Sequence, residues 1–163
     1  MDKYLKSCKT VFADVNNLKL TLESFALIIL SLIANTVASV YASEKASNYV
    51  TDIILSNIRV YDVDWIFNYG AMIFWIFIVI LCIKKPQRIA FVLKSTALFI
   101  LIRAVFISLT HLGAFPTQVY IDPASFVSKF TFGGDLFFSG HTGLPFLMAY
   151  VFWDNIKLRI LFI

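Results

Sequence analysis

Long apolar blocks are the feature that most constrains how this chain can fold. They contain two charged residues in all and cover residues 24–41, 65–83, 89–110 and 136–153. A helix needs roughly 20 apolar residues to cross about 30 Å of bilayer hydrocarbon. Since each block approaches that length, the sequence predicts an all-α polytopic transmembrane helix bundle with four spans.

The composition agrees with a membrane protein. Of the 163 residues, 60% are hydrophobic, and the mean hydropathy is +0.81. Soluble domains are usually about 45–50% apolar. The net charge of +4 could suggest nucleic acid as a partner on a soluble protein. Here the basic residues lie beside the apolar blocks, which is typical of cytoplasmic membrane flanks, so we expect membrane lipids and no nucleic acid as partners.

The N-terminal segment, residues 1–23, differs from the rest. Apolar residues recur there at helical spacing, and lysines are interleaved with them. This pattern predicts an amphipathic helix lying on the cytoplasmic surface of the membrane. A partly ordered tail is the alternative. Residues 24–163 form the predicted transmembrane domain.

The distribution of lysine and arginine predicts the orientation. Ten of them lie in the N-terminal segment, in and around the loop after the second block, and after the fourth block. Only three lie in the loops at 43–64 and 111–135, with Arg103 left aside. Cytoplasmic loops carry an excess of Lys and Arg. The N-terminus is therefore predicted to be cytoplasmic, and the two loops to be exoplasmic, periplasmic or luminal.

Arg103 lies well inside the third block. A charged side chain at the centre of a membrane helix costs about 2.5–3.5 kcal/mol on insertion scales, and such residues mark functional sites by default. The alternative is a structural arginine bonded to helix carbonyls or to a carboxylate such as Asp135. Asn35 and Thr36 interrupt the first block, and we expect both to face other helices, where polar side chains can bond across an interface.

The densest polar cluster opens the fourth block. Ser139 is predicted to cap a helix there, and the first N–H groups of a helix carry a partial positive charge that suits a phosphate oxygen. Gly140 removes side-chain bulk where such a ligand approaches, and His141 can exchange a proton near neutral pH. A structural histidine is the alternative. His111, at the end of the third block, is interpreted as an interfacial residue.

With these residues in view, the chain resembles the sphingomyelin synthase-like family of the phosphatidic acid phosphatase type 2 superfamily. Residues 134–142 match that family's G-D-x-x-x-S-G-H-T signature at each fixed position. Arg103 with Thr110, and the loop at 52–55, are supporting matches. The resemblance covers roughly residue 25 to the end.

The resemblance implies a six-span fold and a two-histidine phosphotransfer mechanism that needs no metal and no cofactor. It implies a phospholipid or sphingolipid substrate and a site on the exoplasmic, periplasmic or luminal side. It does not specify an oligomeric state. In the implied site, His141 protonates the leaving oxygen, Asp135 orders the loop, and the phosphate is held by Arg103, Ser139, Gly140 and Thr142.

One family motif has no counterpart in this sequence. The family's nucleophile lies in a later H-x-x-x-D motif, whereas His111 and His141 are the two histidines here and neither is followed four residues later by aspartate. We expect either that the natural sequence continues beyond Ile163 with that motif, or that the chain is a degenerate relative that does not turn over. The sequence thus predicts a lipid phosphatase or headgroup transferase, and the alternative is a non-catalytic pseudoenzyme, scaffold or transporter subunit.

Overall fold

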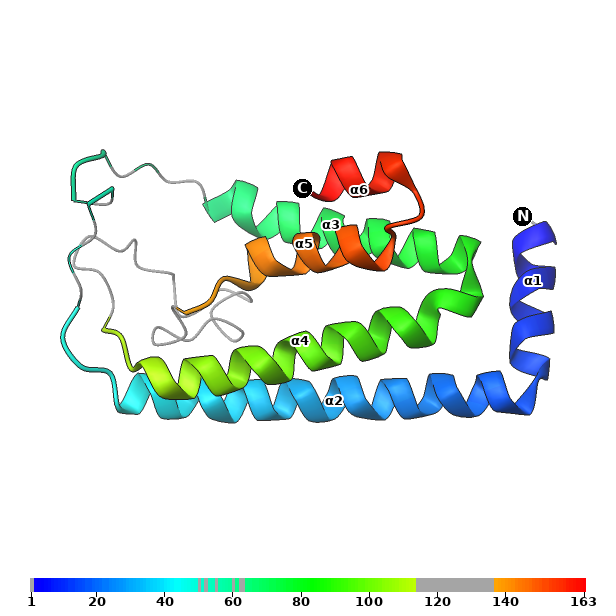
Figure 1. Ribbon diagram of the computed structural model, residues 1–163, viewed down its shortest axis with the longest axis horizontal. Coiled ribbons are helices and arrows are strands. Elements are labelled where there is room, and N and C mark those ends of the chain that lie inside the picture. The colour runs from blue at the N-terminus through cyan, green and yellow to red at the C-terminus, as the bar shows by residue number, and fades with distance from the viewer. Residues whose placement is uncertain are drawn as a thin grey trace.

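The computed structural model describes residues 2–49, 51, 53–54, 56–59, 61, 64–113 and 137–163. All regular structure in these ranges is helical, which confirms the predicted all-α class. Figure 1 shows the long helices lying side by side, with α1 across one end. The elements are α1 (Asp2–Ala13), α2 (Val15–Glu44), α3 (Asp64–Lys84), η1 (Pro86–Arg88), α4 (Ile89–Thr110), α5 (Gly140–Val151) and α6 (Ile156–Phe162).

The N-terminal segment forms a helix, as predicted, but it breaks at Asp14. Asp14 has an extended backbone, and its Oδ1 accepts a hydrogen bond of 3.0 Å from the backbone N–H of Asn16. Such a cap satisfies one of the unpaired N–H groups at the start of α2. The first predicted span is therefore the centre of a 30-residue helix that begins at Val15.

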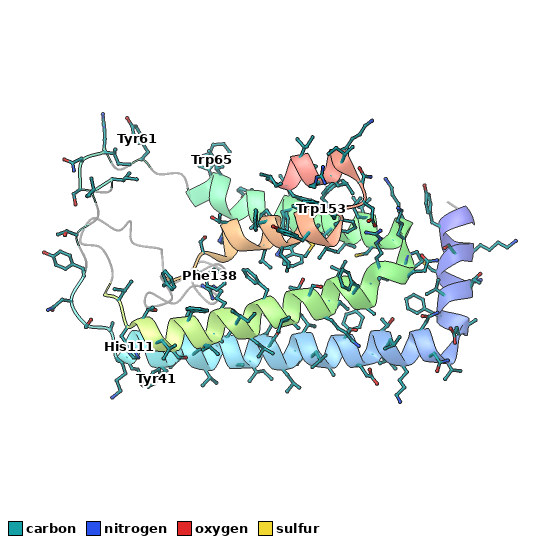
Figure 2. All side chains as sticks on the ribbon, viewed as in Figure 1. Tyr41, Tyr61, Trp65, His111, Phe138 and Trp153 are labelled. Atoms are coloured by element: carbon teal, nitrogen blue, oxygen red, sulfur yellow. The ribbon has the colours of Figure 1, made fainter. Side chains whose placement is uncertain are left out.

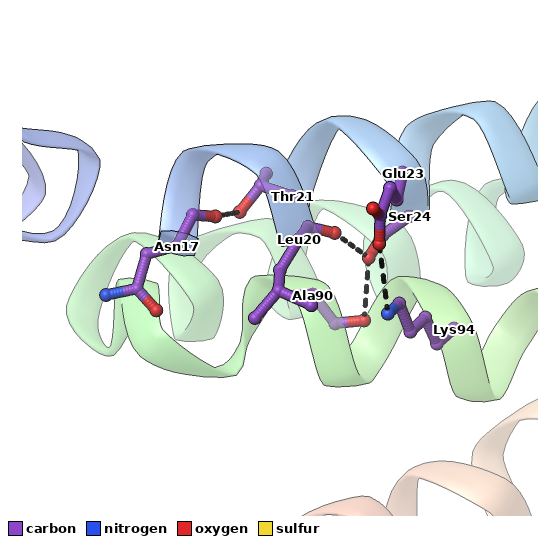
Figure 3. Close-up of polar contacts among 7 residues, drawn as sticks. All are labelled: Asn17, Leu20, Thr21, Glu23, Ser24, Ala90 and Lys94. Atoms are coloured by element: carbon purple, nitrogen blue, oxygen red, sulfur yellow. Dashed lines mark hydrogen bonds and ion pairs between the residues drawn. The ribbon is translucent and has the colours of Figure 1, made fainter. Parts of the chain in front are cut away.

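Helices α2 and α4 form the most extensive contact, and they run in the same direction. Small buried residues such as Ser31 and Ala104 let the two backbones approach closely. Figure 3 shows Ser24 Oγ donating to the carbonyl of Ala90 at 3.3 Å. Ser24 and Ala90 are 66 residues apart in the chain. Asn35 and Arg103, a second bonded pair further along the two helices, are 68 residues apart. Because the separation stays nearly constant, the helices are parallel.

The second layer contains α3, α5 and α6. Its core includes Ile78 of α3, Met148 of α5 and Phe162 of α6. Arg88 of η1 joins this layer to α4, since its Nη1 donates to the carbonyl of Val151 at 3.0 Å and its Nη2 pairs with Asp154. The chain turns there, and α6 runs back along α3 and α5 (Figure 1).

Two helices in the described ranges are long and apolar enough to cross a membrane, namely Val15–Glu44 and Pro86–Thr110. Tyr69–Lys84, within α3, is apolar but shorter. Helix α5 has 12 residues and is shorter than the predicted fourth span; at 1.5 Å per residue it covers about 18 Å. The structure thus has two helices that could cross a membrane, while four spans and their orientation stay predictions.

Candidate functional site

Arg103 lies in the C-terminal half of α4, and its guanidinium joins three parts of the fold. Its Nε donates to the backbone carbonyl of Phe138 at 2.9 Å, just before α5. Its Nη1 donates to Oδ1 of Asn35 in α2 at 2.8 Å. The side chain is half-buried. Arg103 therefore points into the bundle, toward the segment that carries the predicted phosphate-binding residues.

Two phenylalanines on the same face of α4 hold that segment in place. The ring of Phe138 lies edge-on to Phe99 and Phe106, with centroid distances of 5.2 and 6.0 Å. Residues three or four apart on a helix share a face, so Phe99, Arg103 and Phe106 form one continuous strip. Figure 2 shows Phe138 between α4 and the start of α5. The aromatic contacts and the Arg103 bond together fix where α5 begins.

Helix α5 begins at Gly140, and Ser139 occupies the N-cap position with an extended backbone, as predicted. The Ser139 hydroxyl makes no capping hydrogen bond, and the side chains of His141 and Thr142 are exposed in the first turn. Among the described residues, a Cβ added to Gly140 would meet only Arg103 Nε, at 3.9 Å. Packing therefore leaves room at position 140, next to the guanidinium.

The start of α5 lies some distance inside the bundle, and this position affects which ligands it can bind. Arg103 precedes the last residue of α4, Thr110, by seven positions, which is roughly 10 Å along the axis. Helix α5 therefore starts inside the bundle instead of at its end. In membrane proteins, half-helices of this kind point the positive ends of their dipoles at anionic groups. A guanidinium beside such a helix start makes a setting suited to an anion.

The other predicted residues are placed as follows. Asp135, the predicted loop-ordering residue, lies outside the described residues, as do Asp52 and Asp62. Within the described ranges, no group of three His, Cys, Asp or Glu side chains could hold a metal ion. Asn35 faces another helix, as expected. The expectation for Thr36 is wrong, because its hydroxyl bonds Leu32 O of its own helix and the residue is exposed.

His111 belongs to a different part of the bundle. It ends α4 in a left-handed conformation with φ of 34°, and its carbonyl accepts from the N–H and hydroxyl of Ser47 at 3.0 and 2.9 Å. Its ring lies edge-on to Tyr41 at 5.3 Å. Figure 2 shows both rings at the end of the α2–α4 pair. His111 therefore packs against α2 near the chain turn.

The sequence does not single out three residues of the site: Phe99, Phe106 and Gly143. A Cβ on Gly143 would lie 2.6 Å from Cε2 of Phe99 and closer still to its Cζ. The signals were present, since the two phenylalanines flank Arg103 at helical spacing and the glycine interrupts an apolar helix. Aromatic residues and glycine are common in membrane helices, so neither signal was specific.

We expect Gly143→Ala to lower the free energy of unfolding by about 1–3 kcal/mol, the usual effect of overpacking, because the Phe99 ring must move away from Phe138. Gly70→Ala is the matched control, since a Cβ there meets no atom of the described residues within 4 Å. Unfolding in detergent, followed by circular dichroism, measures both. Adding Phe99→Leu to Gly143→Ala should restore part of the lost stability. Equal stability of Gly143→Ala and Gly70→Ala would contradict the close approach of the Phe99 ring to position 143.

No protein-family model, no curated protein and no solved structure matches the chain. The geometry around Arg103 and the start of α5, together with the motif resemblance, is therefore what indicates a function.

Proposed function

We propose that this protein is a membrane-embedded enzyme that acts on the phosphate of a phospholipid or sphingolipid. It does so as a lipid phosphatase or as a phosphocholine-type headgroup transferase. The observation that carries the proposal is the position of the Arg103 guanidinium, which donates to the Phe138 carbonyl directly before Ser139, Gly140 and His141. The residues of the predicted motif and the half-buried Arg103 side chain are thus neighbours in space.

Electrostatics favour a phosphate at this place. The first N–H groups of α5 carry a partial positive charge, and the charge of Arg103 adds to it. A guanidinium also matches the geometry of phosphate oxygens with two parallel bonds. Within a membrane interior, where the dielectric constant is low, each of these interactions is stronger than it would be in water.

The residue roles in this proposal follow the resemblance. The resemblance assigns the attacking role to the histidine of the H-x-x-x-D motif, a motif that these 163 residues do not contain. That histidine attacks phosphorus to form a phosphohistidine, the bond from phosphorus to the leaving oxygen breaks, and His141 donates a proton to that oxygen. Arg103 and the backbone of Ser139, Gly140 and Thr142 hold the phosphoryl oxygens throughout. Asp135 orders the preceding loop. An acceptor, either water or a lipid hydroxyl, then takes the phosphoryl group, and this choice separates phosphatase from transferase.

We propose a cytoplasmic N-terminus and further spans beyond α2 and α4. The support is the gathering of basic residues at one end of the bundle, where α1 contacts η1 and Arg88 binds the turn after α5. Cytoplasmic flanks are rich in such residues. The parallel course of α2 and α4 directs their C-terminal ends, and the start of α5, toward the opposite, non-cytoplasmic side.

A headgroup assay on the protein in mixed micelles tests the function. Phosphatidylcholine and phosphatidic acid with labelled headgroups are offered together with ceramide and diacylglycerol. Label transferred to ceramide or diacylglycerol identifies a transferase, and water-soluble labelled phosphate from phosphatidic acid identifies a phosphatase. If neither product forms, the protein is a non-catalytic membrane protein and the proposal is overturned.

A further inference from the structure

Asn35 is a polar residue in the apolar centre of α2, at the seam with α4. Its Oδ1 accepts the hydrogen bond from Arg103 Nη1 at 2.8 Å, and the contact is partly buried. A polar side chain at such a position is costly unless it is hydrogen-bonded. The bond to Arg103 accounts for its presence, and it ties α2 to the candidate site although α2 contributes no residue of the predicted motif.

The chemistry of the pair is specific. A guanidinium has only donors, so the amide must present its oxygen to Arg103. The amide carries no net charge and therefore orients Arg103 without neutralising it. A carboxylate at the same place would also accept the bond, but it would pair with the guanidinium and repel an anionic ligand.

We infer that Asn35 is a positioning residue that holds the Arg103 guanidinium toward the start of α5, where the proposed phosphate site lies. This inference rests on the proposed function, since it concerns the same phosphate site. It adds α2 to the machinery, through an amide that accepts a hydrogen bond from the arginine.

Two substitutions separate positioning from simple structural support. Asn35→Ala removes the acceptor. Asn35→Asp keeps an acceptor at the same place but adds a negative charge. Thr36→Ala is the matched control, because the neighbouring hydroxyl bonds only within α2 and faces outward. Each variant is purified in detergent, its unfolding is followed by circular dichroism, and its affinity for inorganic phosphate is measured by ³¹P NMR titration.

The two Asn35 variants are expected to rank in opposite orders for stability and for phosphate affinity. Asn35→Asp should be at least as stable as the unaltered protein, whereas Asn35→Ala should be less stable. Phosphate affinity should fall by roughly tenfold in Asn35→Ala, the loss typical of a hydrogen bond to a charged group. It should fall further in Asn35→Asp because the added charge opposes the anion. Thr36→Ala should change neither quantity.

Several outcomes would overturn the inference. If Asn35→Asp binds phosphate as well as the unaltered protein does, or if affinity simply follows stability across the variants, Asn35 has only a structural role. The proposed phosphate site itself would still stand in that case, provided that the unaltered protein binds phosphate saturably. An unaltered protein that binds no phosphate removes the site, and the inference with it.

Discussion

Replacing His141 with alanine is expected to abolish the release or transfer of lipid phosphate while leaving membrane insertion intact. The side chain is exposed in the first turn of α5, so its removal leaves no cavity in the core. Loss of a general acid typically lowers the rate by about 10²–10⁴-fold. Turnover of labelled phosphatidylcholine and phosphatidic acid in mixed micelles measures the effect.

A second histidine provides the control for this experiment. His111→Phe keeps a ring edge-on to Tyr41, and Nε2 of His111 makes no hydrogen bond with the residues that the structure describes. We therefore expect this variant to retain its activity. Undiminished turnover by His141→Ala would remove His141 from the mechanism, and equal losses in both variants would indicate a general effect on the fold.

Arg103→Ala is expected to eliminate phosphate binding and also to destabilise the fold. The substitution removes the bonds to Phe138 O and Asn35 Oδ1, which are both partly buried. Because hydrogen bonds to charged groups contribute about 1.5–3 kcal/mol each, loss of the two bonds should lower the free energy of unfolding by about 3–6 kcal/mol. Phosphate titration and detergent-based unfolding measure the two effects separately.

Two further variants test whether the effect depends on the guanidinium of Arg103 or on any cation of α4. Arg103→Lys keeps the charge but lacks the planar fork, so it should bind phosphate more weakly and not restore both bonds. Lys94→Ala removes another cation of α4, whose ammonium is 3.9 Å from Glu23 on a partly exposed surface. Such pairs contribute about 0–1 kcal/mol, and phosphate affinity should not change. Phosphate binding that persists in Arg103→Ala would exclude the guanidinium from the site.

Much of the local structure could be predicted because it depends on nearby residues. The third apolar block coincides with α4, Ile89–Thr110, since a basic turn with Pro86 precedes it and the polar loop follows. Ser139 was expected at the N-cap and occupies it. The break at Asp14 was missed, although Asp is a favoured capping residue, because the apolar periodicity continues across it.

The candidate site was only partly predictable. The sequence indicated Arg103 and the segment around His141 separately, on the grounds of cost in the membrane and of motif resemblance. It did not indicate that Phe99 and Phe106, which flank Arg103 on α4, both make edge-to-face contacts with Phe138. Nor did it indicate Gly143, whose missing side chain makes space for Phe99. These are contacts between helices, and periodicity within one helix does not reveal them.

The sequence alone thus determined the helical class and the placement of the apolar blocks, because helix formation and membrane affinity depend on the local order of side chains. Only the tertiary structure decided that α5 starts beside Arg103 and that α6 turns back along α3. The first depends on the bond from Arg103 to Phe138, and the second on the bonds from Arg88 to Val151 and Asp154. Each joins residues far apart in the chain, and their meeting depends on how whole helices pack.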